Sequence, residues 1–180
     1  RGIGILYKKE GKMLTPLHDG GGQEKGLRSG TENLPAIAGM AMAIRLLLED
    51  EPEKAKREAE IKAKIVDYLK DKPGINIFSP VSDGFAPHIL CFALEGIRGE
   101  TLVHTLEDQD IYTSTTSACA SKTADEASTL VSMRIDDKIA TSAIRLSFDE
   151  TNTLQEADEF IKVFDKIYNH FAKINHLGEN

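Results

Sequence analysis

The segment 153–171 constrains the fold of this chain more than any other, because it reads as a long helix with a single apolar face. Thr153 and Glu156 are spaced as a capping box at its start. Apolar residues then recur at helical spacing, at Leu154, Ala157, Phe160, Ile161, Phe164, Ile167, Tyr168 and Phe171. Such a helix has to bury that face, so the chain needs a sheet or other helices to pack against it.

The residues before this helix supply the sheet. From residue 75 onward the pattern predicts, in order, strands 75–78 and 89–94, a helix 99–109, a strand 110–115, a short helix near 125–133 and a strand 143–148. The strand 89–94 is nearly all apolar, so we expect it to be central. This order predicts an α/β (α+β) fold in which helices cover a small sheet.

The N-terminal part of the chain has a different pattern. Residues 1–7 read as a strand with no element before it, which suggests a truncated or excised chain. Five glycines in the segment 19–31 predict a loop. A helix is expected to begin near Asn33, with Pro35 in its first turn. Its predicted buried stripe consists of Ile37, Met40, Ala41, Ile44 and Leu48.

A break follows this helix. The acidic stretch 49–53, which includes Pro52, predicts a boundary between two domains, 1–50 and 51–180. The next helix, about 53–70, is strongly charged and has a narrow apolar seam. Opposite charges four positions apart predict two ion pairs along it, Glu58–Lys62 and Glu60–Lys64.

Composition excludes several classes of partner and compartment. With 22 basic and 29 acidic residues the net charge is −7, which argues against binding to nucleic acid or to anionic membranes. No apolar run approaches membrane-spanning length and no signal peptide precedes the first segment, so we expect a cytoplasmic protein. Two cysteines are too few for a disulfide framework or a thiolate zinc site, and the five histidines lack metal-like spacing, so no metal site is expected.

The two cysteines lie in different surroundings. Cys119 lies among small and hydroxylated residues with Lys122 nearby, which suits a nucleophilic thiol, or equally a small residue filling a tight turn. Cys91 lies in the apolar strand 89–94, where a free thiol packs as a small hydrophobe.

Two further segments suit the binding of an anion. The segment 20–31 offers backbone amides, the Ser29 and Thr31 hydroxyls and the start of a helix, although a plain glycine-rich connector is an alternative. Arg145 alternates with Ile144 and Leu146, so its side chain should lie on the opposite face of the strand. It is either a surface or ion-paired residue, or a fork for a carboxylate.

Four segments, in this order, resemble one family: 20–33, 96–100, 114–121 and 142–147 resemble the cysteine desulfurases of the class-V aminotransferases. The resemblance covers essentially the whole chain. It implies the aminotransferase-like fold with a large domain that binds pyridoxal phosphate (PLP) and a small C-terminal domain. Residues 1–50 would be the tail of the large domain, and 51–180 the small domain that carries the cysteine loop.

The resemblance also implies a reaction and its residues. Such enzymes are homodimers that convert L-cysteine to alanine and leave a persulfide for iron–sulfur cluster or thiolated-RNA synthesis. Cys119 would accept the sulfur, Arg145 would hold the substrate carboxylate, and Thr31 would contact the PLP phosphate of the opposite subunit. Arg28 would help to shape that loop.

One departure limits the expected activity. The chain begins after the place where the family has its PLP lysine, so it should not hold PLP covalently or be active alone. Its partner would be a sulfur-acceptor protein, either an iron–sulfur scaffold or a tRNA-thiolation enzyme. Two alternatives remain: a non-catalytic small domain that binds a scaffold or sulfur acceptor, and another PLP enzyme such as a selenocysteine lyase.

Overall fold

The computed structural model of the chain describes residues 2–115 and 128–174. By its internal contacts the chain divides into two compact units, Arg1–Glu51 and Pro52–Asn180, called unit 1 and unit 2 below. No helix of the described residues is long and apolar enough to cross a membrane.

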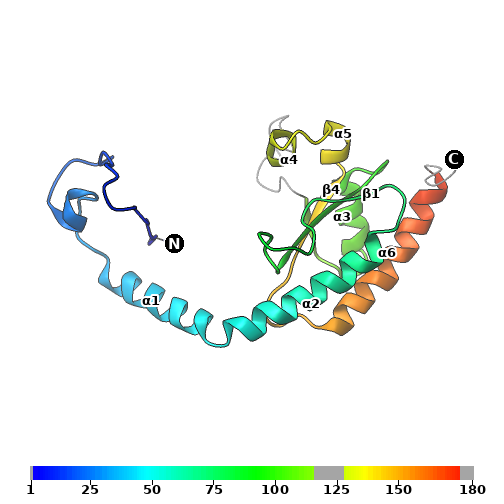
Figure 1. Ribbon diagram of the computed structural model, residues 1–180, viewed down its shortest axis with the longest axis horizontal. Coiled ribbons are helices and arrows are strands. Elements are labelled where there is room, and N and C mark those ends of the chain that lie inside the picture. The colour runs from blue at the N-terminus through cyan, green and yellow to red at the C-terminus, as the bar shows by residue number, and fades with distance from the viewer. Residues whose placement is uncertain (1, 116–127, 175–180) are drawn as a thin grey trace. The chain divides into compact units, whose positions relative to one another are not determined.

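Unit 2 is a mixed helix and sheet structure whose elements follow the expected order (Figure 1). They are α2 (Glu51–Leu69), β1 (Ile75–Ile77), β2 (Ile89–Leu94), α3 (Gly99–Glu107), β3 (Ser114–Thr115), α4 (Ser128–Ser132), α5 (Asp137–Ala140), β4 (Ala143–Ser147) and α6 (Leu154–Ile174). The short helix α5 has no counterpart in the sequence-based prediction. The side chain of Asp136 caps it by accepting a hydrogen bond from the Lys138 N–H at 2.9 Å.

The described strands form one antiparallel sheet in the order β1-β2-β4-β3. β2 pairs with β1 on one side and β4 on the other, which confirms its predicted central place. β3 is much shorter than the predicted strand 110–115. The residues before β3 form the turn that ends α3 and are not part of a strand. Asp110 is in the left-handed region (φ 59°), and the Ile111 N–H donates to the Leu106 carbonyl oxygen at 3.0 Å.

One face of the sheet carries the main core, made with α2, α3 and α6. Phe164 of α6 is fully buried there, and its ring meets those of Phe92 and Phe160, each at a centroid distance of 5.5 Å. The predicted capping box of α6 is confirmed, because the Thr153 N–H donates to Glu156 Oε2 (2.7 Å) and the Glu156 N–H donates to Thr153 Oγ1 (3.2 Å). The apolar stripe of α6 thus builds the core that the sequence indicated.

The other face of the sheet carries a smaller cluster under α4 and α5. Its fully buried members are Ala93, Leu130, Ala140 and Ala143. Cys91 packs against this cluster rather than the main core. Helices therefore cover both faces of the sheet, with the larger layer on the side of α6 (Figure 1).

The predicted ion pairs within α2 are wrong, because tertiary partners replace them. Lys62 is 1% exposed and donates to the Ala86 carbonyl oxygen at 3.0 Å, while Lys64 pairs with Asp158 of α6 at 2.6 Å. Burial lowers the pKa of Lys62. These contacts fasten α2 to α6 and to the loop before β2, which a helix-only pattern does not reveal.

Gly99 begins α3 at a very close approach to β4. A Cβ at this position would lie 2.6 Å from the Ala143 carbonyl oxygen, and the Gly99 N–H donates to the Thr141 carbonyl oxygen at 2.9 Å. Gly99→Ala should lower the free energy of unfolding of unit 2 by about 1–3 kcal/mol, because α3 has to move off the sheet. Urea denaturation measures this. Gly39→Ala on α1 (Leu34–Leu48), where nothing lies within 4 Å of the new Cβ, serves as the control and should leave unit 2 unchanged.

Asp165 links α6 to the end of α2. Its Oδ1 accepts hydrogen bonds from Tyr68 Oη (2.7 Å) and Lys72 Nζ (3.1 Å), and these donors lower the pKa of the Asp165 carboxyl. The stabilisation that they give is present above the ordinary carboxyl pKa and is lost as the pH falls through the lowered value in the folded state.

We therefore expect Asp165→Asn to have a lower melting temperature than the unmodified chain at pH 7, and the difference to shrink as the pH falls below about 4. Thermal unfolding followed by circular dichroism across pH 2–7 checks this. Asp158→Asn removes the more exposed pair with Lys64 and should change the melting temperature little at any pH. A gap between Asp165→Asn and the unmodified chain that stays constant with pH would contradict the expectation.

Unit 1 contains a short 3-10 helix (η1, Gln23–Gly26) and the helix α1. The predicted start of α1 is confirmed, because Asn33 caps it by accepting a hydrogen bond from the Ala36 N–H at 3.2 Å. The predicted strand 1–7 is wrong, since residues 2–9 have no regular secondary structure and no described strand pairs with them. An isolated strand leaves its backbone groups unpaired and is not stable alone.

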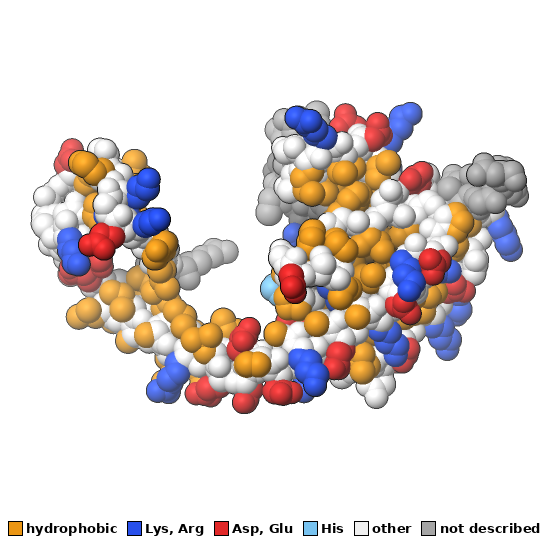
Figure 2. Space-filling view, in the orientation of Figure 1, with side chains coloured by type: hydrophobic (Ala, Val, Ile, Leu, Met, Phe, Trp, Pro, Cys, Tyr) orange, Lys and Arg blue, Asp and Glu red, His pale blue; other side chains and the backbone are white. Residues whose placement is uncertain are grey.

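The predicted buried stripe of α1 is also wrong for this chain, since α1 has no buried residue. Figure 2 shows hydrophobic side chains over much of its surface. The most exposed large ones on this helix are Leu34, Leu46, Leu47 and Leu48, each more than half exposed. The sequence pattern identified an apolar helix correctly, but unit 1 does not contain the surface that would cover it.

Candidate functional site

Arg145 lies in the middle of β4, paired with Cys91 of β2 on one side and Ser114 of β3 on the other. Its neighbours Ile144 and Leu146 are buried in the main core. Because successive residues of a strand point to opposite faces, the Arg145 side chain lies on the other face, as the sequence predicted. The Arg145 Nε is buried and has no hydrogen-bond partner.

A buried Nε without an acceptor is unusual, because buried polar atoms in folded proteins nearly always have a hydrogen-bond partner. Among residues 2–115 and 128–174, no carboxylate forms an ion pair with Arg145. Of the two interpretations of Arg145, a residue paired within the fold and a fork for a carboxylate, these surroundings favour the second.

The predicted nucleophile, Cys119, lies outside the described residues, and its role stays a prediction. The last described residue before Cys119 is Thr115, at the end of β3. Thr115 directly follows Ser114, which is the β3 partner of Arg145. Sequence spacing alone did not show this, because strand register decides which residues of separate segments are neighbours.

Cys91 is the other thiol, and it is partly buried. Burial raises the pKa of its thiol to about 11, while the positive charge of Arg145 acts in the opposite direction. The thiol is therefore protonated at neutral pH and is a poor nucleophile. Its backbone is held in place, since the Cys91 N–H donates to Ser79 Oγ at 2.6 Å and the Phe78 N–H donates to the Cys91 carbonyl oxygen at 2.9 Å.

Thr31, the predicted phosphate contact, lies in unit 1. It lines a cavity of about 940 Å³ together with Arg28, Ser29 and Gly30. The hydrogen bonds that hold the loop include those from Ser29 Oγ to the His18 carbonyl oxygen (3.1 Å) and from the Gly30 N–H to Gln23 Oε1 (3.3 Å). Gly30 has a φ of +107°, which residues with a side chain rarely adopt, so this turn needs glycine.

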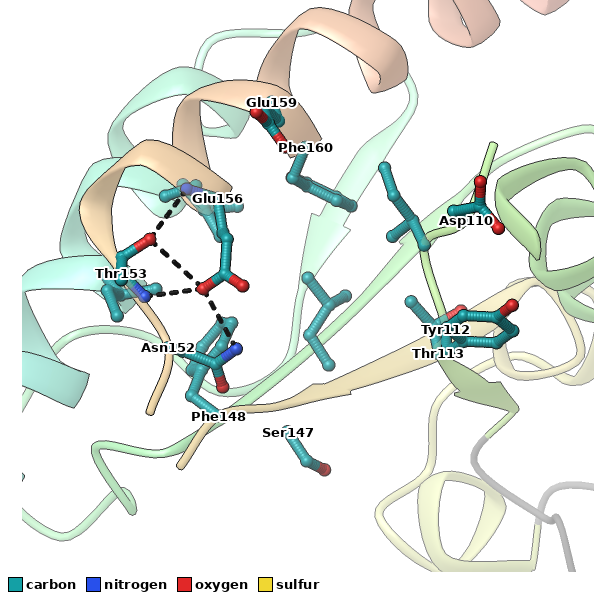
Figure 3. Close-up of a pocket in the computed structure, with 15 residues that line it drawn as sticks. Asp110, Tyr112, Thr113, Ser147, Phe148, Asn152, Thr153, Glu156, Glu159 and Phe160 are labelled. Atoms are coloured by element: carbon teal, nitrogen blue, oxygen red, sulfur yellow. Dashed lines mark hydrogen bonds between the residues drawn. The ribbon is translucent and has the colours of Figure 1, made fainter. Parts of the chain in front are cut away.

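Unit 2 has a second cavity of about 370 Å³, at the start of α6 (Figure 3). Its floor is apolar, and Asp110, Glu156 and Glu159 line it with negative charge. The capping hydrogen bond from the Thr153 N–H lowers the pKa of Glu156 most, so this carboxyl is committed to the helix start. Arg145 does not line this cavity.

Comparisons with known proteins agree with one another. The family description of class-V aminotransferases matches residues 1–160. A NifS/IcsS protein homologue of Lactobacillus delbrueckii subsp. bulgaricus is 78% identical over 99% of this chain and 46% of its own length. The cysteine desulfurase IscS of Clostridium botulinum is 32% identical over 100% of this chain and 46% of its own length. The chain thus spans about half the length of these curated relatives.

Solved structures give the same result. A NifS-like protein matches 91% of this chain and 41% of its own length, with a TM-score of 0.71 and 36% identity. A NifS-like protein from Rickettsia africae matches 88% of this chain and 41% of its own length, with a TM-score of 0.68 and 29% identity. The small antiparallel sheet with its helices therefore corresponds to part of these larger structures.

Proposed function

The chain belongs to the class-V aminotransferase family and has cysteine desulfurases among its relatives, and on that basis we propose that it is the C-terminal part of a cysteine desulfurase. The full-length enzyme would remove sulfur from L-cysteine, leaving alanine and a persulfide on Cys119. The observation that carries the proposal is Arg145, a half-buried arginine whose buried Nε has no partner, on the strand paired with β3.

Each residue of the site has a defined part in this reaction. Arg145 binds and orients the carboxylate of the amino acid through its planar fork of N–H donors. The Cys119 thiolate forms an S–S bond with the substrate sulfur while the bond between that sulfur and carbon breaks. The electron pair stays on carbon, which takes up a proton and becomes the methyl group of alanine. The sulfur is thereby oxidised and the carbon reduced, and no outside oxidant is needed.

The family depends on PLP, and unit 1 contains groups that fit one end of it. The Ser29 and Thr31 hydroxyls line the cavity of unit 1 and suit the phosphate, where Thr31 would contact the cofactor of the opposite subunit. When bound, PLP supplies an electron sink that stabilises negative charge on the substrate carbon. The remaining cofactor contacts would come from the half of the enzyme that this chain does not include.

The two units would then have separate places in the enzyme. Unit 1 would be the tail of the large PLP-binding domain and unit 2 the small domain. The exposed apolar surface of α1 suits burial in a larger, homodimeric protein. The persulfide would pass to an acceptor protein of iron–sulfur cluster or thiolated-RNA synthesis in the cytoplasm.

The test of this function is sulfide release. The full-length protein, purified with PLP, is incubated with L-cysteine and a thiol reductant, and sulfide and alanine are measured together. We expect equal amounts of the two products. No release of either would overturn the proposal and favour a non-catalytic domain that binds a scaffold or sulfur acceptor. Release from selenocysteine alone would indicate a selenocysteine lyase.

Replacing Arg145 should weaken substrate binding. Arg145→Ala in the full-length enzyme should raise the KM for L-cysteine by about 30-fold or more, which is the loss of a charge-assisted pair of about 2 kcal/mol. Arg145→Lys keeps the charge but not the planar fork, so its KM should lie between those of the unmodified enzyme and Arg145→Ala. Steady-state kinetics measure both, and Arg57→Ala, on α2 and outside the proposed site, is the control. An unchanged KM in Arg145→Ala would exclude the carboxylate role.

A further inference from the structure

A row of three side chains crosses the sheet on the face opposite the main core. The register pairs Cys91 of β2 with Arg145 of β4, and Arg145 with Ser114 of β3. Residues directly opposite each other on antiparallel strands share a face and have Cβ atoms about 4.5–5.5 Å apart. The aliphatic part of the Arg145 side chain therefore begins between the side chains of Cys91 and Ser114.

Both neighbours are neutral at the pH of the cell. A serine hydroxyl does not ionise, and burial keeps the Cys91 thiol protonated by raising its pKa. Within the described part of the chain no acid pairs with Arg145, and its Nε lacks an acceptor. An aspartate at either neighbouring position would lie within reach of the guanidinium and form a charge-assisted pair with it.

We propose that Cys91 and Ser114 are positioning residues that keep Arg145 without an internal counter-ion and so determine how tightly it binds the substrate carboxylate. This inference rests on the proposed function. A carboxylate from within the sheet would compete with the carboxylate of the substrate for the same N–H groups. A small neutral neighbour on each side leaves the fork open, while the strands still fix the direction of the arginine.

The first arm of the test needs no cofactor and uses the chain itself. Ser114→Asp and its near-isosteric neutral control Ser114→Asn are each made with Arg145 present and with Arg145→Met. Urea denaturation gives the equilibrium constants of unfolding. For each background we compare the folding equilibrium constant of Ser114→Asp with that of Ser114→Asn. We expect this Asp-to-Asn ratio to be at least about fivefold larger with Arg145 than with Arg145→Met, because the free guanidinium pairs with the new carboxylate. Equal Asp-to-Asn ratios in the two backgrounds would overturn the proposal. Ser114 is suited to this arm because it lies on the short edge strand, where substitutions disturb the core least.

The second arm uses the full-length enzyme. Cys91→Asp should raise the KM for L-cysteine at least about tenfold more than Cys91→Asn does, with the kcat of the two variants within about twofold of each other. Melting temperatures of the two variants show whether a change in folding accounts for the difference. If Asp and Asn raise KM equally, the positioning role is overturned, since only the lost thiol would matter. If the unmodified enzyme releases no sulfide, the proposed function is wrong, and Cys91 and Ser114 cannot affect the binding of its substrate. The urea experiment on Ser114 still decides whether Arg145 lacks a counter-ion.

Discussion

Cys119→Ser in the full-length enzyme is expected to reduce sulfide release from L-cysteine by about 10³-fold or more. The hydroxyl of serine is not ionised near neutral pH, and oxygen does not replace sulfur as the acceptor in an S–S bond. The loss should appear in kcat, while binding of the substrate through Arg145 persists. Sulfide detection under single-turnover and multiple-turnover conditions separates these two effects.

The chain provides a matched control for this experiment. Its sequence has two cysteines, so Cys91→Ser removes the other thiol and should retain activity. Without a reductant, mass spectrometry should find one additional sulfur atom on the peptide that contains Cys119 and none on the peptide that contains Cys91. Activity that survives Cys119→Ser, or a persulfide found on Cys91, would move the nucleophile away from Cys119.

Phe164→Ala is expected to lower the free energy of unfolding of unit 2 by about 3–5 kcal/mol. The side chain is fully buried where α6 meets the sheet, and its ring contacts Tyr68, Phe92 and Phe160. Its removal forfeits apolar burial and leaves a cavity that three other aromatic rings surround. Urea denaturation followed by circular dichroism measures the loss.

Two further variants test the cause of this loss. Phe164→Leu keeps much of the volume and should cost clearly less than Phe164→Ala. Tyr112→Ala also truncates an aromatic residue, but its side chain is 76% exposed, so the change should stay within about 0.5 kcal/mol. A similar loss in Tyr112→Ala and Phe164→Ala would contradict the central place of Phe164 in the core.

Local pattern predicted most of unit 2. The capping residues Thr153 and Glu156 and the apolar strand 89–94 carry their own signals, so the start of α6 and the place of β2 followed from the sequence. The neighbours of Lys62 and Arg145 did not follow from it. They depend on the loop that folds over α2 and on strand register, which join residues far apart in the chain.

The candidate site divides in the same way. The chemistry of an arginine inside a strand left an ion-paired residue and a carboxylate fork open, and the family resemblance favoured the fork. That its Nε lacks an internal partner could be seen only in three dimensions. The segment that carries Cys119 was identified by its residue types and by the family resemblance. Cys119 itself lies outside the described residues. In unit 1 the helix α1 was predicted correctly, whereas its burial was not, because a helical pattern shows which residues are apolar and not what packs against them.

The sheet order has a consequence for how this protein can vary over evolutionary time. β2 pairs directly with β4, although α3, β3, α4 and α5 lie between them in the sequence. Thr115 of β3 and Ser128 of α4 are described residues of this connection between β2 and β4. As a general rule, doubling the length of a flexible loop costs only about 0.6 kcal/mol of closure entropy. Insertions and deletions in the connections between β2 and β4 should therefore be tolerated without refolding the sheet.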